Sequence, residues 1–273
     1  MSARFGRGLV LGKFYPPHAG HSYLISSARA KCERLTVMVL AAHVESIPLE
    51  ERRAWLAELH PDCEIVAGYD DVPMDIEDAD IWARHMEAIE ALLDEQADAV
   101  FTSEPYGDEL ARRLGAVHVS VDPARTAVPC SGTAVRADPA RYWWALAPPV
   151  RAWFARRVVV VGAESTGTTT LAAALAHHYS TLWVPEAGRD WSASRPGGLS
   201  ARWRSEEFDE IARRQAASED EAARKLPRPL LFCDTDALAT AVWHERYMGR
   251  RSPNVEAFAA ARVPDLYLLT LDD

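Results

Sequence analysis

Two segments share a layout that constrains the fold more than any other feature of the sequence: a short apolar strand, a glycine-containing loop, then a helix. In the first, the predicted strand Arg7–Leu11 runs into the loop Gly12–Gly20 and the helix His21–Glu33. The second repeats this order over residues 157–179, with its loop at Gly162–Gly167. Such a unit typically opens a parallel α/β sheet. Two openings about 150 residues apart therefore predict two α/β domains.

The alternation of strands and helices continues through the chain, which supports α/β architecture in both halves. In the first half we expect strands at Leu35–Ala41, Glu64–Ala67, Ala99–Thr102 and Val117–Val121, and helices at Leu49–Leu59, Asp80–Glu95, Gly107–Leu114 and from Ser131 to Arg136. In the second half we expect strands at Trp183–Pro185, Leu230–Cys233 and Leu266–Leu271, and helices at Ser205–Lys225 and Ala237–Tyr247. The Trp- and Pro-rich stretch Arg141–Phe154 is expected to join the two domains.

Composition narrows the class of protein. The chain has 273 residues, is 48% hydrophobic and carries a formal net charge of −10, which disfavours nucleic acid as a partner. Its four cysteines have no CxxC spacing, so neither a disulfide framework nor a zinc site is expected. No signal peptide and no apolar run of membrane-spanning length is found. We expect a soluble, cytoplasmic protein without a membrane partner; a homo-oligomer is compatible with the sequence.

The loop from Gly12 to His21 has the spacing G-x-F-x-P-x-H-x-G-H. Its glycines allow tight turns and close approach of the backbone to a ligand. His18 and His21 are three residues apart, so at a helix start they lie on one face, beside backbone amides that attract anions. No covalent nucleophile is present. The predicted chemistry is attack by a substrate phosphate on the α-phosphorus of ATP, with the protein positioning the groups and stabilising charge.

A second element supports this interpretation. Ser131, Gly132, Thr133 and Arg136 place hydroxyls, a glycine and a guanidinium at another predicted helix start. This is a second arrangement suited to phosphate. Alone, Ser-Gly-Thr is common turn chemistry. After a paired-histidine loop and a long α/β stretch, it favours a nucleotide site.

These motifs resemble the HxGH and ISSTxxR-type motifs of the nucleotidyltransferase superfamily. The chain is more closely similar to the bifunctional NadR-type enzymes, which join a nicotinamide mononucleotide (NMN) adenylyltransferase to a ribosylnicotinamide kinase. The resemblance covers nearly the whole chain and rests on four segments: Gly12–His21, Ile47-Pro48 with Arg52–Leu56, Ser103–Gly107 and Ser131–Arg136. It implies a Rossmann-like nucleotidyltransferase domain over residues 1–150 and a P-loop kinase-like α/β domain over residues 157–273.

The resemblance also implies roles for single residues. His18, His21 and Arg136 would contact ATP phosphates, with further ATP-binding positions at Gly12, Lys13, Phe14, Gly20, Ser131, Gly132 and Thr133. Trp82 would stack on nicotinamide, although a core aromatic on its predicted helix explains it equally well. Because eleven residues precede Gly12, we expect no DNA-binding extension and no repressor role.

The second glycine loop matches the phosphate-loop pattern G-x-x-x-x-G-K-[ST] except that Thr168 replaces the lysine. Its backbone amides still suit phosphate oxygens, and Thr169 stands where a hydroxyl normally binds Mg²⁺. The ammonium that normally bridges the β- and γ-phosphates is missing. The predicted phosphate-binding residues are Gly162, Glu164, Ser165, Thr166, Gly167, Thr168, Thr169 and Thr170.

Acidic residues follow later strands of this half. The apolar strand at Leu230 ends in Asp234 and Asp236, carboxylates suited to Mg²⁺ and to activation of a substrate hydroxyl. We expect Asp234 and Thr169 as metal ligands. Glu186 and Arg189 resemble the family's substrate-side motif. The chain ends after a strand where related kinases continue into a lid, so we expect an incomplete kinase domain.

The leading hypothesis is an enzyme of NAD biosynthesis that transfers AMP from ATP to NMN, giving NAD and pyrophosphate with Mg²⁺ screening the triphosphate. A second domain would phosphorylate ribosylnicotinamide. One alternative is a nucleotidyltransferase for another acceptor, such as phosphopantetheine. The other is a nucleotide-sensing protein whose P-loop domain binds ATP without turnover, which Thr168 would favour.

Overall fold

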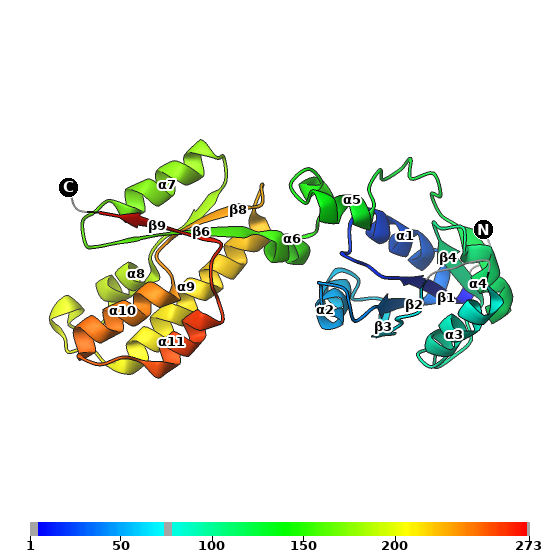
Figure 1. The fold of residues 1–273 in the computed structure, drawn as a ribbon, viewed down its shortest axis with the longest axis horizontal. Helices are drawn as coiled ribbons and strands as arrows, with labels where there is room; N and C mark the ends of the chain where they lie inside the picture. The colour runs from blue at the N-terminus through cyan, green and yellow to red at the C-terminus, as the bar shows by residue number, and fades with distance from the viewer. Residues whose placement is uncertain (1–4, 74–77, 272–273) are drawn as a thin grey trace. The chain divides into compact units, whose positions relative to one another are not determined.

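The structure, a computed structural model, describes residues 5–73 and 78–271. The chain folds as two compact units, Met1–Val150 and Arg151–Asp273. Each unit is built around its own sheet (Figure 1), and every recorded strand pairing in both sheets is parallel.

The sheet of the first unit has the strand order β3-β2-β1-β4-β5. Its strands are β1 (Phe5–Gly12), β2 (Cys32–Ala41), β3 (Glu64–Tyr69), β4 (Ala99–Thr102) and β5 (Val117–Ser120). Its helices are α1 (Ala19–Arg29), α2 (Leu49–Leu59), α3 (Ala79–Glu90), α4 (Gly107–Leu114) and α5 (Gly132–Ala137), followed by a 3₁₀ turn at Trp143–Ala145. The strand order reverses direction between β1 and β4, and ligands of open α/β sheets bind at the carboxyl ends of the strands at such a point.

Alternating strand residues contribute side chains to two separate apolar cores, one on each face of this sheet. Val10 packs in one core with residues of α1 and α2, and its neighbour Leu9 packs in the other with residues of α3 and α4. Figure 1 shows α1 and α3 on opposite sides of the strands. Because both faces are covered, the middle of β1, the second half of β2 and all of β4 are mainly apolar and buried, as central parallel strands usually are.

The sheet of the second unit has the order β7-β8-β6-β9. Its strands are β6 (Arg156–Gly162), β7 (Leu182–Val184), β8 (Leu230–Asp234) and β9 (Leu266–Thr270). Its helices are α7 (Thr168–His178), α8 (Ala187–Ser194), α9 (Ser205–Lys225), α10 (Ala237–Met248) and α11 (Pro253–Ala260), with a 3₁₀ turn at Gly198–Ser200. Helix α7 lies on one side of the strands, and α9, α10 and α11 pack together on the other (Figure 1).

Several element boundaries differ from the sequence-based expectation. Helix α1 begins at Ala19 and ends at Arg29, because the side chain of His18 caps its first turn and Cys32 already belongs to β2. Helix α3 ends at Glu90, five residues early. Three helices were not expected: α8, α11 and α6 (Pro148–Phe154), which occupies the predicted junction. Helix α8 has eight residues and buries none of them.

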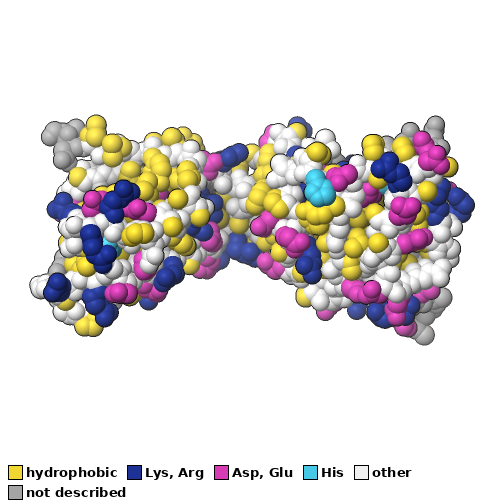
Figure 2. All heavy atoms as spheres, turned by 60° about the horizontal axis from the view of Figure 1, so that its bottom comes forward, with side chains coloured by type: hydrophobic (Ala, Val, Ile, Leu, Met, Phe, Trp, Pro, Cys, Tyr) yellow, Lys and Arg dark blue, Asp and Glu magenta, His cyan; other side chains and the backbone are white. Residues whose placement is uncertain are grey.

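The surface shows no concentration of one charge on the face drawn in Figure 2, where acidic and basic side chains are interspersed over both units. Within residues 5–73 and 78–271, no helix is both long and apolar enough to cross a membrane.

The tight centre of the first sheet gives a test of the fold. A Cβ added at Gly8 would lie 2.4 Å from Cys32 Sγ and 3.0 Å from both Leu35 Cδ1 and Phe101 Cε2. We expect Gly8→Ala to lower the free energy of unfolding by about 1–3 kcal/mol, because the packed core has no room for it. Urea denaturation followed by circular dichroism measures this. Adding Cys32→Ala removes the worst contact and should recover part of the loss; a Gly8→Ala variant as stable as the unaltered chain would contradict the packing described.

Candidate functional site

A cavity of about 860 Å³ lies in the first unit, lined by the residues that follow β1, β3 and β4. This size is at the upper end of the range for small-molecule sites and leaves room for a nucleotide and a second substrate. The structure brings all the residues predicted for the first site to this cavity: Gly12, Lys13, Phe14, His18, Gly20, His21, Trp82, Ser131, Gly132, Thr133 and Arg136.

His18 is a neutral hydrogen-bond donor in this cavity. Its Nδ1 accepts a hydrogen bond from the backbone N–H of Gly20 at 3.1 Å, so the proton of the neutral ring resides on Nε2. Burial, with a smaller effect of the nearby Arg125 charge, lowers the pKa of His18 to about 4. Cys130 Sγ lies 3.3 Å from the same Nδ1. Near neutral pH, the ring therefore presents one fixed N–H without carrying a charge.

His21 stacks on His18, with ring centroids 3.8 Å apart. Burial, followed by the effects of His18 and Arg125, holds the pKa of His21 well below its usual value. Its Nδ1 is buried and has no partner in the described structure. The buried ring of Phe14 also packs against His21, with ring centroids 4.9 Å apart. Phe14, which the sequence placed among the ATP-binding residues, thus supports the second histidine.

The Ser131–Arg136 turn docks directly on the histidine loop through Tyr15. The guanidinium of Arg136 donates to the carbonyl oxygen of Tyr15 and stands 4.3 Å from the centroid of its ring. A Cβ added at Gly132 would lie only 2.8 Å from the same carbonyl oxygen, so only glycine permits this approach. Ser131 caps α5 by accepting from the N–H of Ala134, and Thr133 accepts from Arg136.

A buried arginine, Arg52, holds the histidine loop in place through hydrogen bonds to backbone carbonyls. Arg52 is fully buried and donates to the carbonyl oxygens of Ile47 and Lys13, and to Glu45 Oε2 at 2.6 Å. Its guanidinium stacks 4.4 Å from the centroid of the Tyr15 ring. Glu45 also binds Lys13 Nζ at 2.8 Å, so the side chain of Lys13 is held at the loop. The resemblance included Arg52, but its burial and these contacts are visible only in the tertiary structure.

Sequence reasoning missed Arg125, a further cation on the cavity wall. It lies in a turn in which the Asp122 carboxylate accepts hydrogen bonds from the N–H groups of Thr126, Ala127 and Val128. Its guanidinium is paired with Glu104 at 2.6 Å. No motif spacing marks this loop, and only the fold brings it to the histidines.

The other end of the cavity is lined by residues of α3 and the segment after β3. Trp82 is 5% exposed and packs in the apolar core with Met86 and Ile89, which supports the core interpretation, while it also lines the cavity. His85 pairs with Asp70 at 2.5 Å through Nδ1, and both side chains are nearly buried. This pair, which carries no recognisable sequence spacing, was not predicted.

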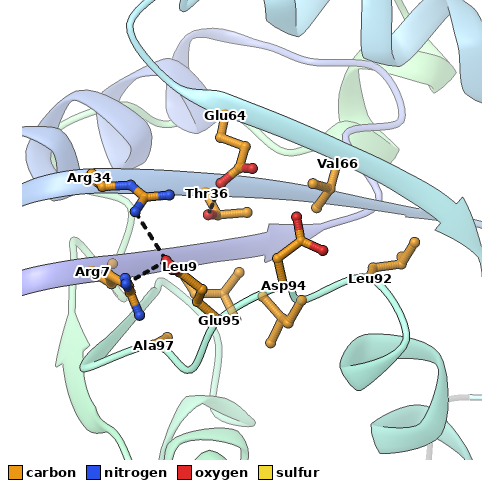
Figure 3. A pocket seen from close by; sticks show the side chains of 12 residues that line it. Arg7, Leu9, Arg34, Thr36, Glu64, Val66, Leu92, Asp94, Glu95 and Ala97 are labelled. Atoms are coloured by element: carbon orange, nitrogen blue, oxygen red, sulfur yellow. Dashed lines mark hydrogen bonds and ion pairs between the residues drawn. The ribbon is translucent and has the colours of Figure 1, made fainter.

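A second hollow of the first unit is too small to bind a nucleotide. Figure 3 shows Arg7 and Arg34 converging on Glu95, at 2.6 and 3.0 Å, beside the amino-terminal parts of β1 and β2. The cavity holds about 30 Å³, which is room for about one or two water molecules. It lies at the strand ends opposite to the histidine loop, where ligands of such sheets do not bind.

In the second unit, the loop after β6 has the backbone of an anion-binding loop. Ser165 and Gly167 have φ values of 69° and 84°, and left-handed residues of this kind turn successive N–H groups toward one point. Thr166 anchors the loop by bonding Thr270 of β9 at 2.6 Å. Gly162 packs so closely that an added Cβ would lie 2.0 Å from the Thr270 hydroxyl.

The residues predicted to hold Mg²⁺ lie together beside this loop. Val160 of β6 pairs with Asp234 of β8, and Asp234 Oδ2 accepts from the Thr169 hydroxyl at 2.5 Å. Arg189 Nη2 donates to the same hydroxyl at 3.1 Å. Among the described residues, no group of three or more metal-ligating side chains occurs. A hydroxyl and a carboxylate in contact still fit Mg²⁺, which takes few protein ligands and completes its shell with phosphates and water.

Asp236, which the sequence predicted as catalytic, is engaged within the fold. Its Oδ1 accepts from the N–H of Ala239 at 2.9 Å, which caps α10, and its Oδ2 accepts from the Tyr267 hydroxyl at 2.5 Å. Both oxygens are therefore engaged within the fold. The structure places Asp234, and not Asp236, against Thr169.

Comparison with known proteins agrees with the division of the chain into two units. Residues 9–138 match the cytidylyltransferase-like family, and residues 157–273 match an AAA domain family. The chain is 31% identical over 282 residues to the trifunctional NAD biosynthesis/regulator protein NadR of Escherichia coli (strain K12), covering 96% of this chain and 68% of that protein. The NadR protein of Salmonella typhimurium matches with the same identity and coverage.

Two solved structures share the fold. A NadR protein in complex with NR has a TM-score of 0.78 at 23% identity, covering 98% of this chain and 80% of that one. A NadR protein in complex with NAD and AMP-PNP has a TM-score of 0.74 at 22% identity, covering 98% and 81%.

A cytidylyltransferase-like α/β domain with a paired-histidine cavity, followed by an AAA-type P-loop domain, defines a two-domain nucleotide-binding protein of the nucleotidyltransferase class. The fold class predicted from the sequence is therefore confirmed. The chain belongs to the NadR family, and the resemblance found in its motifs is confirmed by the identity over nearly its whole length.

The environment of His18 predicts a pH dependence of stability. Burial lowers the pKa of His18 to about 4, below the value of about 6.5 expected in the unfolded chain. Between these values the unfolded chain binds more protons, so the free energy of unfolding should fall as the pH drops from about 6.5 to about 4. Urea unfolding across this range measures it, and ¹⁵N NMR should show the Nε2–H form of His18 near neutral pH.

The matched control is His18→Asn, which keeps a good helix cap but has no titrating group. It should reduce the slope of stability against pH. A His18 resonance that titrates near its ordinary value would refute the buried, neutral ring.

Proposed function

We propose that the first unit is an NMN adenylyltransferase that uses ATP. The observation that carries the proposal is the meeting of the paired-histidine loop and the Ser131–Arg136 turn at one cavity, where the strand order reverses. The resemblance to NadR proteins supports the acceptor, and residues 1–150 and 157–273 are proposed as the two functional domains.

In this reaction, a phosphate oxygen of NMN forms a bond to the α-phosphorus of ATP. The bond from that phosphorus to the α–β bridging oxygen breaks, and pyrophosphate leaves with the electron pair. The Nε2–H of His18 and the ring of His21 lie at the turn into α1, where phosphate oxygens are favoured. Since both rings stay neutral, they donate hydrogen bonds to phosphate oxygens and do not take up a proton themselves.

Positive charge along the triphosphate is assigned to Lys13, Arg125 and Arg136, which line the same cavity. Such groups stabilise the charge that develops on the leaving pyrophosphate. Mg²⁺, when bound, supplies further neutralisation of the phosphates. The nicotinamide end is assigned to the part of the cavity lined by Trp82 and His85.

The histidine assignment predicts the effect of substitution. His18→Ala and His21→Ala should each reduce formation of NAD from ATP and NMN by about 10²- to 10³-fold, the scale for loss of one transition-state donor. Chromatographic assay of NAD measures the rate. His177→Ala, an exposed histidine of α7, is the control and should leave the rate unchanged. Near-normal rates in both cavity variants would exclude the assigned site.

The acceptor is tested by competition between substrates. With ATP present, the unaltered chain should give NAD from NMN and no product from phosphopantetheine. The reverse preference would support the alternative of a nucleotidyltransferase with another acceptor, because the paired-histidine loop itself does not distinguish acceptors.

For the second unit we propose phosphorylation of ribosylnicotinamide to NMN, which supplies the first unit with its substrate. Its support is the phosphate-loop backbone and the contact of Thr169 with Asp234, which fits a Mg²⁺–nucleotide complex. With γ-labelled ATP and ribosylnicotinamide, label should appear in NMN and NAD. Nucleotide binding without label transfer would support the alternative, a nucleotide sensor.

A further inference from the structure

The phosphate loop of the second unit lacks a positively charged side chain, and its backbone amides do not replace that charge. Thr168, a neutral residue, stands where the pattern has a lysine. Three carboxylates surround the loop: Glu164 within it, Glu186 before α8 and Asp234 at the end of β8. Burial raises the pKa of Glu186, the negative charge of Asp234 raises it further, and the charge of Arg189 opposes this shift. A triphosphate needs positive charge here.

The structure brings a guanidinium to this place from α8. Arg189 Nη2 lies 3.1 Å from the hydroxyl of Thr169, the residue directly after Thr168 in the first turn of α7. Its recorded ion pair is with Glu186, at 3.5 Å. The side chain is 63% exposed, so this pair is weak and the guanidinium can turn toward a ligand at little cost.

We propose that Arg189 supplies to the β- and γ-phosphates of the nucleotide the positive charge that a lysine at position 168 would supply. The inference rests on the proposed kinase function of the second unit. It also differs from the substrate-side role that the family resemblance suggested for Arg189, since it assigns Arg189 to the phosphates of the nucleotide. A guanidinium suits this task because it binds two phosphate oxygens at once.

The supported reaction is a phosphoryl transfer. The 5′-hydroxyl oxygen of ribosylnicotinamide forms a bond to the γ-phosphorus, and the bond from that phosphorus to the β–γ bridging oxygen breaks. ADP leaves with the electron pair, and the hydroxyl proton passes to a carboxylate of the site. Charge accumulates on the β-phosphate as ADP leaves, so the contribution of Arg189 grows toward the transition state.

The test compares Arg189→Met, Thr168→Lys and the double variant in the full chain, by transfer of label from γ-labelled ATP into NMN plus NAD. Arg189→Met should lower kcat/KM for ATP by about 10²- to 10³-fold, the scale for one lost transition-state contact. Adding Thr168→Lys should restore at least about tenfold, since it puts an ammonium where the loop pattern has one. Arg213→Met removes a comparable exposed arginine of α9 and should change nothing.

Two results would overturn the inference: an Arg189→Met variant whose defect lies only in the KM for ribosylnicotinamide, or one without any defect. If the unaltered chain transfers no label, the kinase proposal fails. The role of Arg189 is then tested by nucleotide binding instead. In the His18→Ala, His21→Ala chain, calorimetry should then show that Arg189→Met weakens binding of AMP-PNP but not of AMP. Equal effects on both nucleotides, or none, would reject a role at the β- and γ-phosphates.

Discussion

The site of the first unit depends on one contact, the docking of the Ser131–Arg136 turn on the backbone of Tyr15. Arg136 donates to the Tyr15 carbonyl oxygen, and Gly132 lets the two backbones approach. Arg52 packs against the Tyr15 ring as well, and it binds the loop carbonyls from a fully buried position. The loop is thus held from two sides, and the histidine rings are fixed before any ligand arrives. Preorganised donors of this kind need no rearrangement during reaction.

The two units offer different groups to the nucleoside triphosphate that we propose each of them binds. In the first unit, burial keeps His18 and His21 neutral, and positive charge comes from Lys13, Arg125 and Arg136 around them. In the second unit, loop amides form the phosphate cradle, and the charge is assigned to an arginine of a neighbouring helix. In both units, helices connect the parallel strands. This arrangement places helix starts and the carboxyl ends of strands at the same edge of each sheet.

Much of the fold was predictable because local patterns were strong. The ends of α2, α4 and α9 and of β4 were predicted to the residue; α4, for example, ends where Gly115 adopts a φ of 63°. Helix α8, which was missed, is short, with eight residues, and buries none of them. Asp236 was expected in catalysis from its place after a strand, but the sequence does not reveal that Ala239 and Tyr267 engage both of its oxygens.

The sequence by itself determined the two strand–loop–helix openings, the paired-histidine and Ser-Gly-Thr motifs, the missing lysine and the family. These are local features, in which residue type and spacing carry the information. Only the tertiary structure decided that Arg125 lines the same cavity as the histidines, that Arg52 is buried against Lys13 and Tyr15, and that Arg189 reaches the hydroxyl of Thr169. Cys130 and His18 meet across 112 residues, and Arg136 and Tyr15 across 121. Such contacts arise because parallel strands, distant in sequence, end at one shared edge, and no local pattern encodes that meeting.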